Sequence, residues 1–237
     1  MQIVIIGGSG GLGEAFTEYF LQDTECEIIS TYNNTEPKKN LLSQGSITWE
    51  KVDVTNESQV AEFCSNLEHI KIFINAAGML HNSEYSPEKS TRQIDREYML
   101  KSIEINTLPT MLFAKYLTKA FRHQEHSVFA TISARVGSIE ENYLGGWYSY
   151  RASKAALNQI LKTLSIEWSR NLKNVCVAAL HPGTTDTKLS APFHRNVPES
   201  QIFSPEKSVI HMGELVKKMT PDQTGQFWSF DGEKLPW

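Results

Sequence analysis

Short runs of Val, Ile and other apolar residues recur along the chain, and several of them end at Gly, Asn or Asp. Runs of this length and composition are typical of buried strands. Strands are therefore expected over 2–6, 27–32, 47–52, 70–75, 127–133, 175–180 and 225–230.

Between these runs, apolar residues repeat every three to four positions, which is the spacing of one helix face. After the third run, Thr55 and Asn56 are both candidates for a helix N-cap ahead of Val60. The longer helices are expected over 12–21, 94–121, 147–171 and 206–218.

Strands that alternate with helices predict right-handed βαβ units and a parallel sheet. The fold class is therefore α/β, a single-domain Rossmann-type doubly wound parallel sheet with helices on both faces, over residues 1–237. Ligands of such folds bind at the carboxyl ends of the strands.

A glycine cluster follows the first strand. Gly7, Gly11 and Gly13 have the spacing GxxxGxG, and a predicted helix begins directly after them. Glycines allow a tight turn and a close approach of backbone to a pyrophosphate, and the helix N-terminus offers free N–H groups. The segment predicts a nucleotide site.

Tyr150 and Lys154 stand four residues apart at the start of a long predicted helix, so both side chains lie on one face. An ammonium beside a phenol stabilises the phenolate and is expected to lower the pKa of the tyrosine. Such a tyrosine can exchange a proton with a carbonyl or alcohol oxygen. Alone, the spacing is equally compatible with a surface pair.

Together, these motifs resemble the short-chain dehydrogenase/reductase superfamily over nearly the whole chain. The glycines match its TGxxxGxG with Ile6 in place of Thr, Asn75-Ala76-Ala77-Gly78 matches its NNAG with one Asn lost, and Tyr150 and Lys154 match its YxxxK. The segment around Tyr150 and the ending Phe230-Asp231-Gly232 resemble the C-factor and sniffer-type carbonyl reductase group.

The resemblance implies an NAD(P)(H)-dependent oxidoreductase that transfers hydride between nicotinamide and a carbonyl or alcohol. It implies that Tyr150 is the acid/base, that Lys154 lowers its pKa and holds the nicotinamide ribose, and that Asn106 anchors a proton-relay water. The cofactor-binding residues it implies are Gly7, Ser9, Gly11, Leu12, Gly13, Thr31, Asp53, Val54, Asn75, Ala76, Ala77, Gly78, Tyr150, Lys154, Pro182, Gly183, Thr184 and Thr187.

The sequence departs from this pattern at the position of the family's usual catalytic serine. In Ser133-Ala134-Arg135-Val136-Gly137-Ser138, alignment on the glycine puts Ala134 at the serine position. Ser133 is one residue early and strand side chains alternate faces. Three alternatives stay open: Ser133 serves, favoured slightly, Ser138 serves instead, or the site lacks the serine.

Cofactor choice is a second departure. The family's NAD-specific members end the second strand with an acid, but residues 30–34 contain none, and Lys38 and Lys39 follow. Gly10 stands where many NADP-preferring relatives have a basic residue. NADP(H) is expected over NAD(H).

Other candidates concern the substrate. Residues of about 188–205 match a substrate lid in the family. Trp147, Tyr148 and Met79 are pocket candidates, and His181 is either a substrate contact or, more commonly for such a residue, structural. Arg135 and Arg151 are near the site in sequence but need not face it.

Two further functions compete with a carbonyl reductase. One is a cofactor-binding signalling or sensor protein with little turnover, favoured by Ala134 and the C-factor resemblance. The other is a dehydratase or epimerase, which the same scaffold supports. The substrate itself is not encoded in any motif.

Composition and charge limit the kinds of binding partner that we expect for the chain. The net charge of −4 gives no reason to expect nucleic acid or an anionic membrane, and no apolar stretch approaches the length of a membrane span. The three cysteines lack CxxC spacing and the histidines lack metal-binding spacing, so free thiols, a cytoplasmic location and no metal are expected. Apolar positions on the helix around 147–168 and the family resemblance predict a homodimer or homotetramer.

Overall fold

A central eight-stranded sheet carries the molecule, with the strand order β10-β9-β6-β5-β4-β1-β2-β3. The computed structural model describes residues 1–22 and 25–237. Every neighbouring pair in this sheet is parallel except β9 and β10. The strands are β1 Gln2–Ile6, β2 Glu27–Tyr32, β3 Ile47–Lys51, β4 Ile70–Asn75, β5 Ser127–Ile132, β6 Val175–His181, β9 Gln226–Ser229 and β10 Lys234–Leu235.

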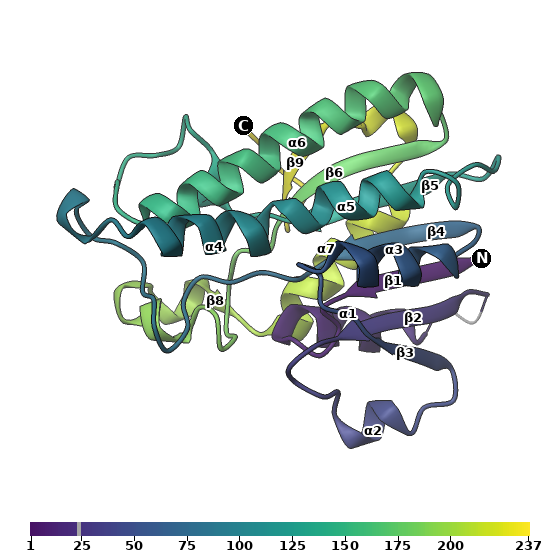
Figure 1. The fold of residues 1–237 in the computed structure, drawn as a ribbon, viewed down its shortest axis with the longest axis horizontal. Helices are drawn as coiled ribbons and strands as arrows, with labels where there is room; N and C mark the ends of the chain where they lie inside the picture. Colours follow the sequence, from purple (N-terminus) through teal and green to yellow (C-terminus); the bar gives the residue numbers. More distant parts are fainter. Residues whose placement is uncertain (23–24) are drawn as a thin grey trace.

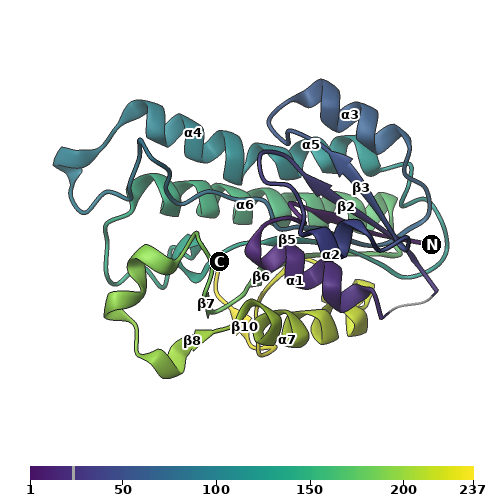
Figure 2. The same ribbon diagram turned by 90° about the horizontal axis from the view of Figure 1, so that it is seen from below.

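Helices cover both faces of the sheet, as predicted. Figure 2 shows α3, α4, α5 and α6 on one side of it and α1 and α7 on the other. The helices are α1 Gly11–Phe20, α2 Lys39–Leu42, α3 Glu57–Ser65, α4 Arg96–Asn106, α5 Leu108–Leu117, α6 Tyr148–Asn171 and α7 Pro205–Lys218. This arrangement confirms the predicted doubly wound α/β fold.

Side chains that alternate along the strands pack into two separate hydrophobic cores, one on each face of the sheet. On the α6 side, the ring of Phe129 lies 4.7 Å from that of Phe73 and 5.2 Å from that of Trp168. On the other side, Ile residues of β1 and β4 pack against Phe16 of α1 and Met212 of α7. Because both faces of the sheet are buried, the strands are apolar at nearly every position. The continuous apolar runs in the sequence therefore predicted the strands.

The predicted helix over 94–121 is two helices. The backbone leaves the helical path at Thr107, with φ −119° and ψ −58°, and Pro109 follows in the first turn of α5. Proline has no N–H to donate, so a helix interior tolerates it poorly, whereas a first turn accepts it. The break leaves Asn106 as the last residue of α4.

Smaller differences lie at element ends. Asn56 is the N-cap of α3, accepting from the N–H groups of Ser58 and Gln59, whereas Thr55 bonds to Asp53. The fifth strand stops at Ile132 because a 3-10 turn over Arg135–Gly137 follows. The short strand β10 and helix α2 were not predicted.

Residues 182–204 extend beyond the sheet. Here β7 (Thr184–Thr185) pairs with β8 (Ile202–Phe203), and 3-10 turns over Ala191–Asn196 and Glu199–Gln201 connect them. In Figure 1 this yellow-green segment lies past the carboxyl ends of the central strands. None of the described helices combines the length and hydrophobicity of a membrane span.

Candidate active site

A cleft of about 620 Å³ opens at the carboxyl ends of the central strands. Its walls come from the glycine loop with the start of α1, residues 76–78, residues 132–134 with Tyr150 and Lys154, and most of residues 181–190. This volume is within the range of small-molecule and cofactor sites. Segments far apart in sequence thus meet where the fold predicts a ligand.

The glycine loop forms one end of the cleft. Gly7 has φ +75°, a conformation that favours glycine, and its N–H donates to Thr31 Oγ1 at 3.0 Å. A Cβ on Gly13 would lie 2.1 Å from the Gly7 carbonyl oxygen, so only glycine allows α1 to pack this closely. Gly10 is the N-cap and provides no side chain, so no described side chain caps the first-turn N–H groups of α1.

This end of the cleft has the form of a dinucleotide cradle. A Cβ on Gly11 would lie 2.7 Å from Thr187 Cγ2, so a substituent there would close the gap between α1 and the segment after β6. Uncapped N–H groups at a helix N-terminus bind anions such as a pyrophosphate. Ser9, Gly11 and Leu12 line this end of the cleft, and the residues present therefore fit the nicotinamide dinucleotide implied by the sequence.

Tyr150 and Lys154 lie side by side in the first turns of α6. They are 7% and 4% exposed, and the Lys154 Nζ lies 5.9 Å from the centre of the Tyr150 ring. Nζ donates to the carbonyl oxygen of Ile132, at the end of β5, at 2.8 Å. The structure thus joins the predicted pair to the cleft wall.

The pKa values of this pair differ from the expectation. Burial raises the pKa of Tyr150 above its ordinary range, with a smaller contribution from Tyr98, and burial lowers the pKa of Lys154 to about 8. Desolvation disfavours the charged form of each group, and it outweighs the predicted lowering of the phenol pKa by the ammonium. Tyr150 is therefore a protonated phenol at neutral pH.

Asn106 is brought to the same place by the break after α4. Its Oδ1 accepts from the Met79 N–H at 2.7 Å, and its Nδ2 donates to Ser153 Oγ at 3.0 Å. A Cβ on Gly78 would lie 3.3 Å from Asn106 Oδ1 and 3.7 Å from Lys154 Nζ. Asn106 and Lys154 thus both border Gly78, in agreement with the predicted grouping.

Glu88 holds the start of α6, and sequence reasoning missed it. Its carboxylate is 1% exposed and accepts from the Ser149 N–H at 3.2 Å and from the Ser149 hydroxyl. Its carbonyl oxygen accepts from the N–H of Trp147, a residue with φ +52°. A carboxylate at a helix N-terminus is stabilising, and here it fixes the turn that carries Tyr150. No short motif in the sequence marks this role.

Neither candidate serine has its hydroxyl proton free for a molecule in the cleft. Ser133 Oγ donates to Asn158 Oδ1 at 2.6 Å in the buried layer under α6, and Ser138 Oγ donates to the carbonyl oxygen of Trp237 at 3.2 Å. Ser133 and Ala134 both line the cleft, whereas Ser138 does not, and Ala134 has no hydroxyl. Of the three alternatives, this geometry favours a site without the usual serine.

His181 also borders the cleft. Its Nδ1 accepts from the backbone N–H of Arg135 at 3.3 Å. Burial lowers its pKa to about 4, the positive charge of Arg135 acts in the same direction, and Asp231 opposes them. The ring is therefore neutral at physiological pH.

Several residues implied as cofactor contacts lie away from the cleft wall. Thr31 is buried beneath the glycine loop, Asn75 donates to Thr110 Oγ1, and Asp53 accepts from the N–H and hydroxyl of Thr55. The cleft wall also leaves out Gly7, Gly13, Val54 and Thr184, whereas it includes Ala76, Ala77, Gly78, Pro182, Gly183 and Thr187. The cofactor-binding roles of all these residues stay predictions.

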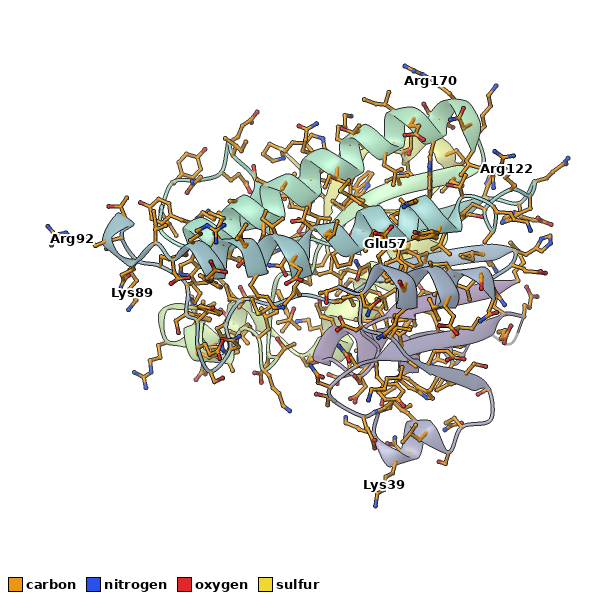
Figure 3. The ribbon with its side chains drawn as sticks, viewed as in Figure 1. Lys39, Glu57, Lys89, Arg92, Arg122 and Arg170 are labelled. Carbon is orange, nitrogen blue, oxygen red and sulfur yellow. The ribbon has the colours of Figure 1, made fainter. Side chains whose placement is uncertain are left out.

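Basic residues divide between the cleft and the surface. Lys38 borders the cleft and pairs with Glu14 at 2.5 Å, whereas Figure 3 shows Lys39 pointing away from the molecule. Arg151 donates to the carbonyl oxygens of Gly146, Val136 and Gly145, so it ties down the loop before α6. Arg135 is exposed beside Glu141. Among the described residues, neither arginine lines the cleft.

Aromatic side chains cluster next to Tyr150. The Trp147 ring lies 6.2 Å from that of Tyr150 and 4.9 Å from that of Phe193, and His81 lies 5.7 Å from Phe193. His81 Nε2 is also 3.1 Å from the Lys188 carbonyl oxygen. These contacts hold the segment after β7 against the site. Tyr148, by contrast, is 37% exposed.

Comparisons with known proteins agree with this geometry. The sequence model described as short chain dehydrogenase matches residues 1–197. The chain is 26% identical over 238 residues to the 1-hydroxy-2-glutathionyl-2-methyl-3-butene dehydrogenase of Rhodococcus sp. (strain AD45), covering 99% of each chain. It is 27% identical over 144 residues to C-signal of Myxococcus xanthus, covering 61% of this chain and 81% of that one.

Solved structures show the same fold. The carbonyl reductase Sniffer of D. melanogaster superposes with a TM-score of 0.85 at 22% identity, covering 100% of this chain and 99% of that one. The NADPH-bound carbonyl reductase from chicken fatty liver gives a TM-score of 0.86 at 20% identity, covering 100% and 94%. The predicted resemblance to the C-factor and sniffer-type group is confirmed.

Proposed function

The chain belongs to the short-chain dehydrogenase family, and from this premise we propose that it is an NADP(H)-preferring carbonyl reductase that also catalyses the reverse alcohol oxidation. The observation that carries the proposal is the buried pair Tyr150 and Lys154 on a cleft that also contains an uncapped helix N-terminus. Bound there, the cofactor supplies or accepts the hydride.

Tyr150 is the general acid of the reduction. Because burial raises its pKa, the phenol is protonated at neutral pH and is ready to donate to a carbonyl oxygen as hydride arrives at the carbon. Lys154 stabilises the phenolate that remains. Lys154 and Asn106 both border Gly78, and a water held between them would return the proton. Lys154 also holds the nicotinamide ribose.

The preference for NADP(H) rests on Lys38. It borders the cleft just before α2, and its ammonium pairs with Glu14 of the same wall at 2.5 Å. A 2′-phosphate would compete with Glu14 for this ammonium through charge-assisted hydrogen bonds. The cofactor named for the chicken carbonyl reductase points to the same choice.

The substrate class is inferred from the aromatic side chains next to Tyr150. Trp147 lies beside Tyr150 and packs against Phe193, and the described part of the cleft wall has no arginine to bind an acidic substrate. We therefore favour an uncharged, partly aromatic ketone or aldehyde, with residues of about 188–205 as its lid. A partner copy of the chain would cover the exposed apolar residues Leu100, Met111 and Ile166 of α4, α5 and α6, as a homodimer or homotetramer.

The second candidate function is a cofactor sensor with little turnover. It is favoured by one observation, the absence of a serine hydroxyl at Ala134. A dehydratase or epimerase has no specific support in the cleft.

Turnover against a substrate panel tests the proposal. NADPH and NADH oxidation are followed with aromatic and aliphatic ketones, aldehydes and quinones, and NADP⁺ reduction with the alcohol named for the Rhodococcus relative. Binding of each cofactor is measured by fluorescence in parallel. Turnover with NADPH supports the reductase, whereas tight NADPH binding without turnover on any substrate supports the sensor.

A further inference from the structure

Reduction of a carbonyl places negative charge on its oxygen, and enzymes stabilise that charge with a fixed hydrogen-bond donor. Ala134, which lines the cleft together with Tyr150, provides no side-chain donor. The hydroxyls of Ser133 and Ser138 are engaged by Asn158 and the carbonyl of Trp237. If the chain reduces carbonyls, as proposed above, another group must supply the second hydrogen bond.

His181 lies directly beside Ala134. The N–H of Ser133 donates to the carbonyl oxygen of Leu180 at 2.7 Å, and the N–H of Arg135 donates to Nδ1 of His181 at 3.3 Å. The residues on both sides of Ala134 are thus bonded to residues 180 and 181. His181 and Ala134 line the same cleft as Tyr150.

The hydrogen bond at Nδ1 fixes the tautomer. Nδ1 accepts, so in the neutral ring the proton must be on Nε2, which is then a donor. Nε2 has no hydrogen-bond partner among the side chains described within residues 1–22, 25–195 and 197–237. His181 is half-buried and belongs to the cleft wall, so this N–H is left for a molecule bound in the cleft.

We propose that His181 is a catalytic residue whose Nε2–H donates a hydrogen bond to the substrate carbonyl oxygen, in place of the hydroxyl that Ala134 lacks. This role rests on the proposed reductase function. The oxygen then lies between two donors, the Tyr150 hydroxyl and the His181 ring. Tyr150 transfers its proton, and His181 keeps its own.

A neutral imidazole suits this task. Arg135 and Asp231 are the charged groups that act on the ring, and burial keeps its pKa near 4. His181 therefore remains a neutral donor through the physiological range. A neutral donor stabilises the developing oxyanion without competing with Tyr150 as the proton source.

Three variants test the role. His181→Phe keeps a ring but removes the donor, and His181→Gln carries a side-chain N–H of similar reach. His181→Phe combined with Ala134→Ser returns a hydroxyl to the family's serine position. The exposed His126, exchanged for Phe, is the matched control. We measure kcat and KM with the best substrate of the panel, and the Kd for NADPH.

His181→Phe is expected to lower kcat by about 100-fold or more, the usual loss when an oxyanion donor is removed, with the NADPH Kd unchanged. His181→Gln should retain more activity than His181→Phe, and the double variant should regain at least about tenfold of the loss. If His181→Phe does not fold, His181→Asn replaces it, since Oδ1 still accepts from Arg135 while the side chain is too short to donate at the position of Nε2.

A wild-type kcat in His181→Phe, or in His181→Asn where it replaces that variant, overturns the role of His181 and leaves the reductase proposal standing. So does a double variant that is as slow as its His181→Phe parent. A wild-type protein that turns over no substrate of the panel overturns both proposals together.

Discussion

Ser133→Ala separates a structural serine from a catalytic one. Ser133 and Asn158 are 2% and 3% exposed, and the Oγ–Oδ1 distance is 2.6 Å. The Asn158 Nδ2 already has no partner among the described residues. Removing the hydroxyl leaves the whole buried amide unbonded, and such an unsatisfied group costs about 1–3 kcal/mol.

The expected result is a loss of stability with little change in chemistry. In a chain of this length, about 1 kcal/mol corresponds to roughly 2–4 °C in Tm, so the variant should melt about 2–12 °C lower. Its kcat at 25 °C should stay within about threefold of wild type, because the hydroxyl is bonded to Asn158 and not to substrate.

Calorimetry and steady-state kinetics on the same preparations provide the assay. Ser133→Ala combined with Asn158→Leu removes both partners and should recover part of the lost Tm. Asn158→Leu alone is measured as well, which completes a double-mutant cycle. A 100-fold loss of kcat at unchanged Tm would refute the reasoning and make Ser133 the catalytic serine. Ser138→Ala, measured alongside, tests the other candidate.

Three further predictions address the rest of the site. Glu88→Ala removes the buried cap of α6 and should lower the free energy of unfolding in urea by about 1–3 kcal/mol; an unchanged urea midpoint contradicts that role. Carbonyl reduction should slow as the pH rises through about 8, because Lys154 is an ammonium below that pH and loses its proton above it; a kcat that stays flat to pH 9.5 contradicts this. Lys38→Ala should weaken NADPH binding by about tenfold or more and leave NADH binding nearly unchanged, with Lys39→Ala as the control; equal losses for both cofactors refute the preference.

The fold was predictable because its signals are local. Each buried strand is a short Val- and Ile-rich run, and Gly7, Gly11 and Gly13 are needed by the turn itself. The break in the long helix was also visible in the sequence as Pro109, yet the apolar spacing on either side of it predicted one continuous helix. Pro109 cannot donate a backbone hydrogen bond, so the helix is interrupted before it even though the apolar spacing continues.

The site was only partly predictable, because side-chain direction and distant contacts decide it. The hydroxyl of Ser133 bonds to Asn158, 25 residues away, and Glu88 caps a helix that begins 60 positions later. The prediction that Lys154 lowers the pKa of Tyr150 was wrong for a similar reason. Spacing shows that Lys154 is near, but only the packed structure shows that burial is the larger effect.

The most direct test of the account is the rate of carbonyl reduction by Tyr150→Phe, with NADPH binding measured on the same protein. General acid catalysis contributes about 10²–10⁴-fold, so kcat should fall by that factor while the Kd for NADPH stays unchanged. The exposed Tyr143, exchanged for Phe, is the control and should retain wild-type kcat. A Tyr150→Phe enzyme that reduces the same substrate within about threefold of the wild-type rate would contradict the assignment of Tyr150 as the proton donor.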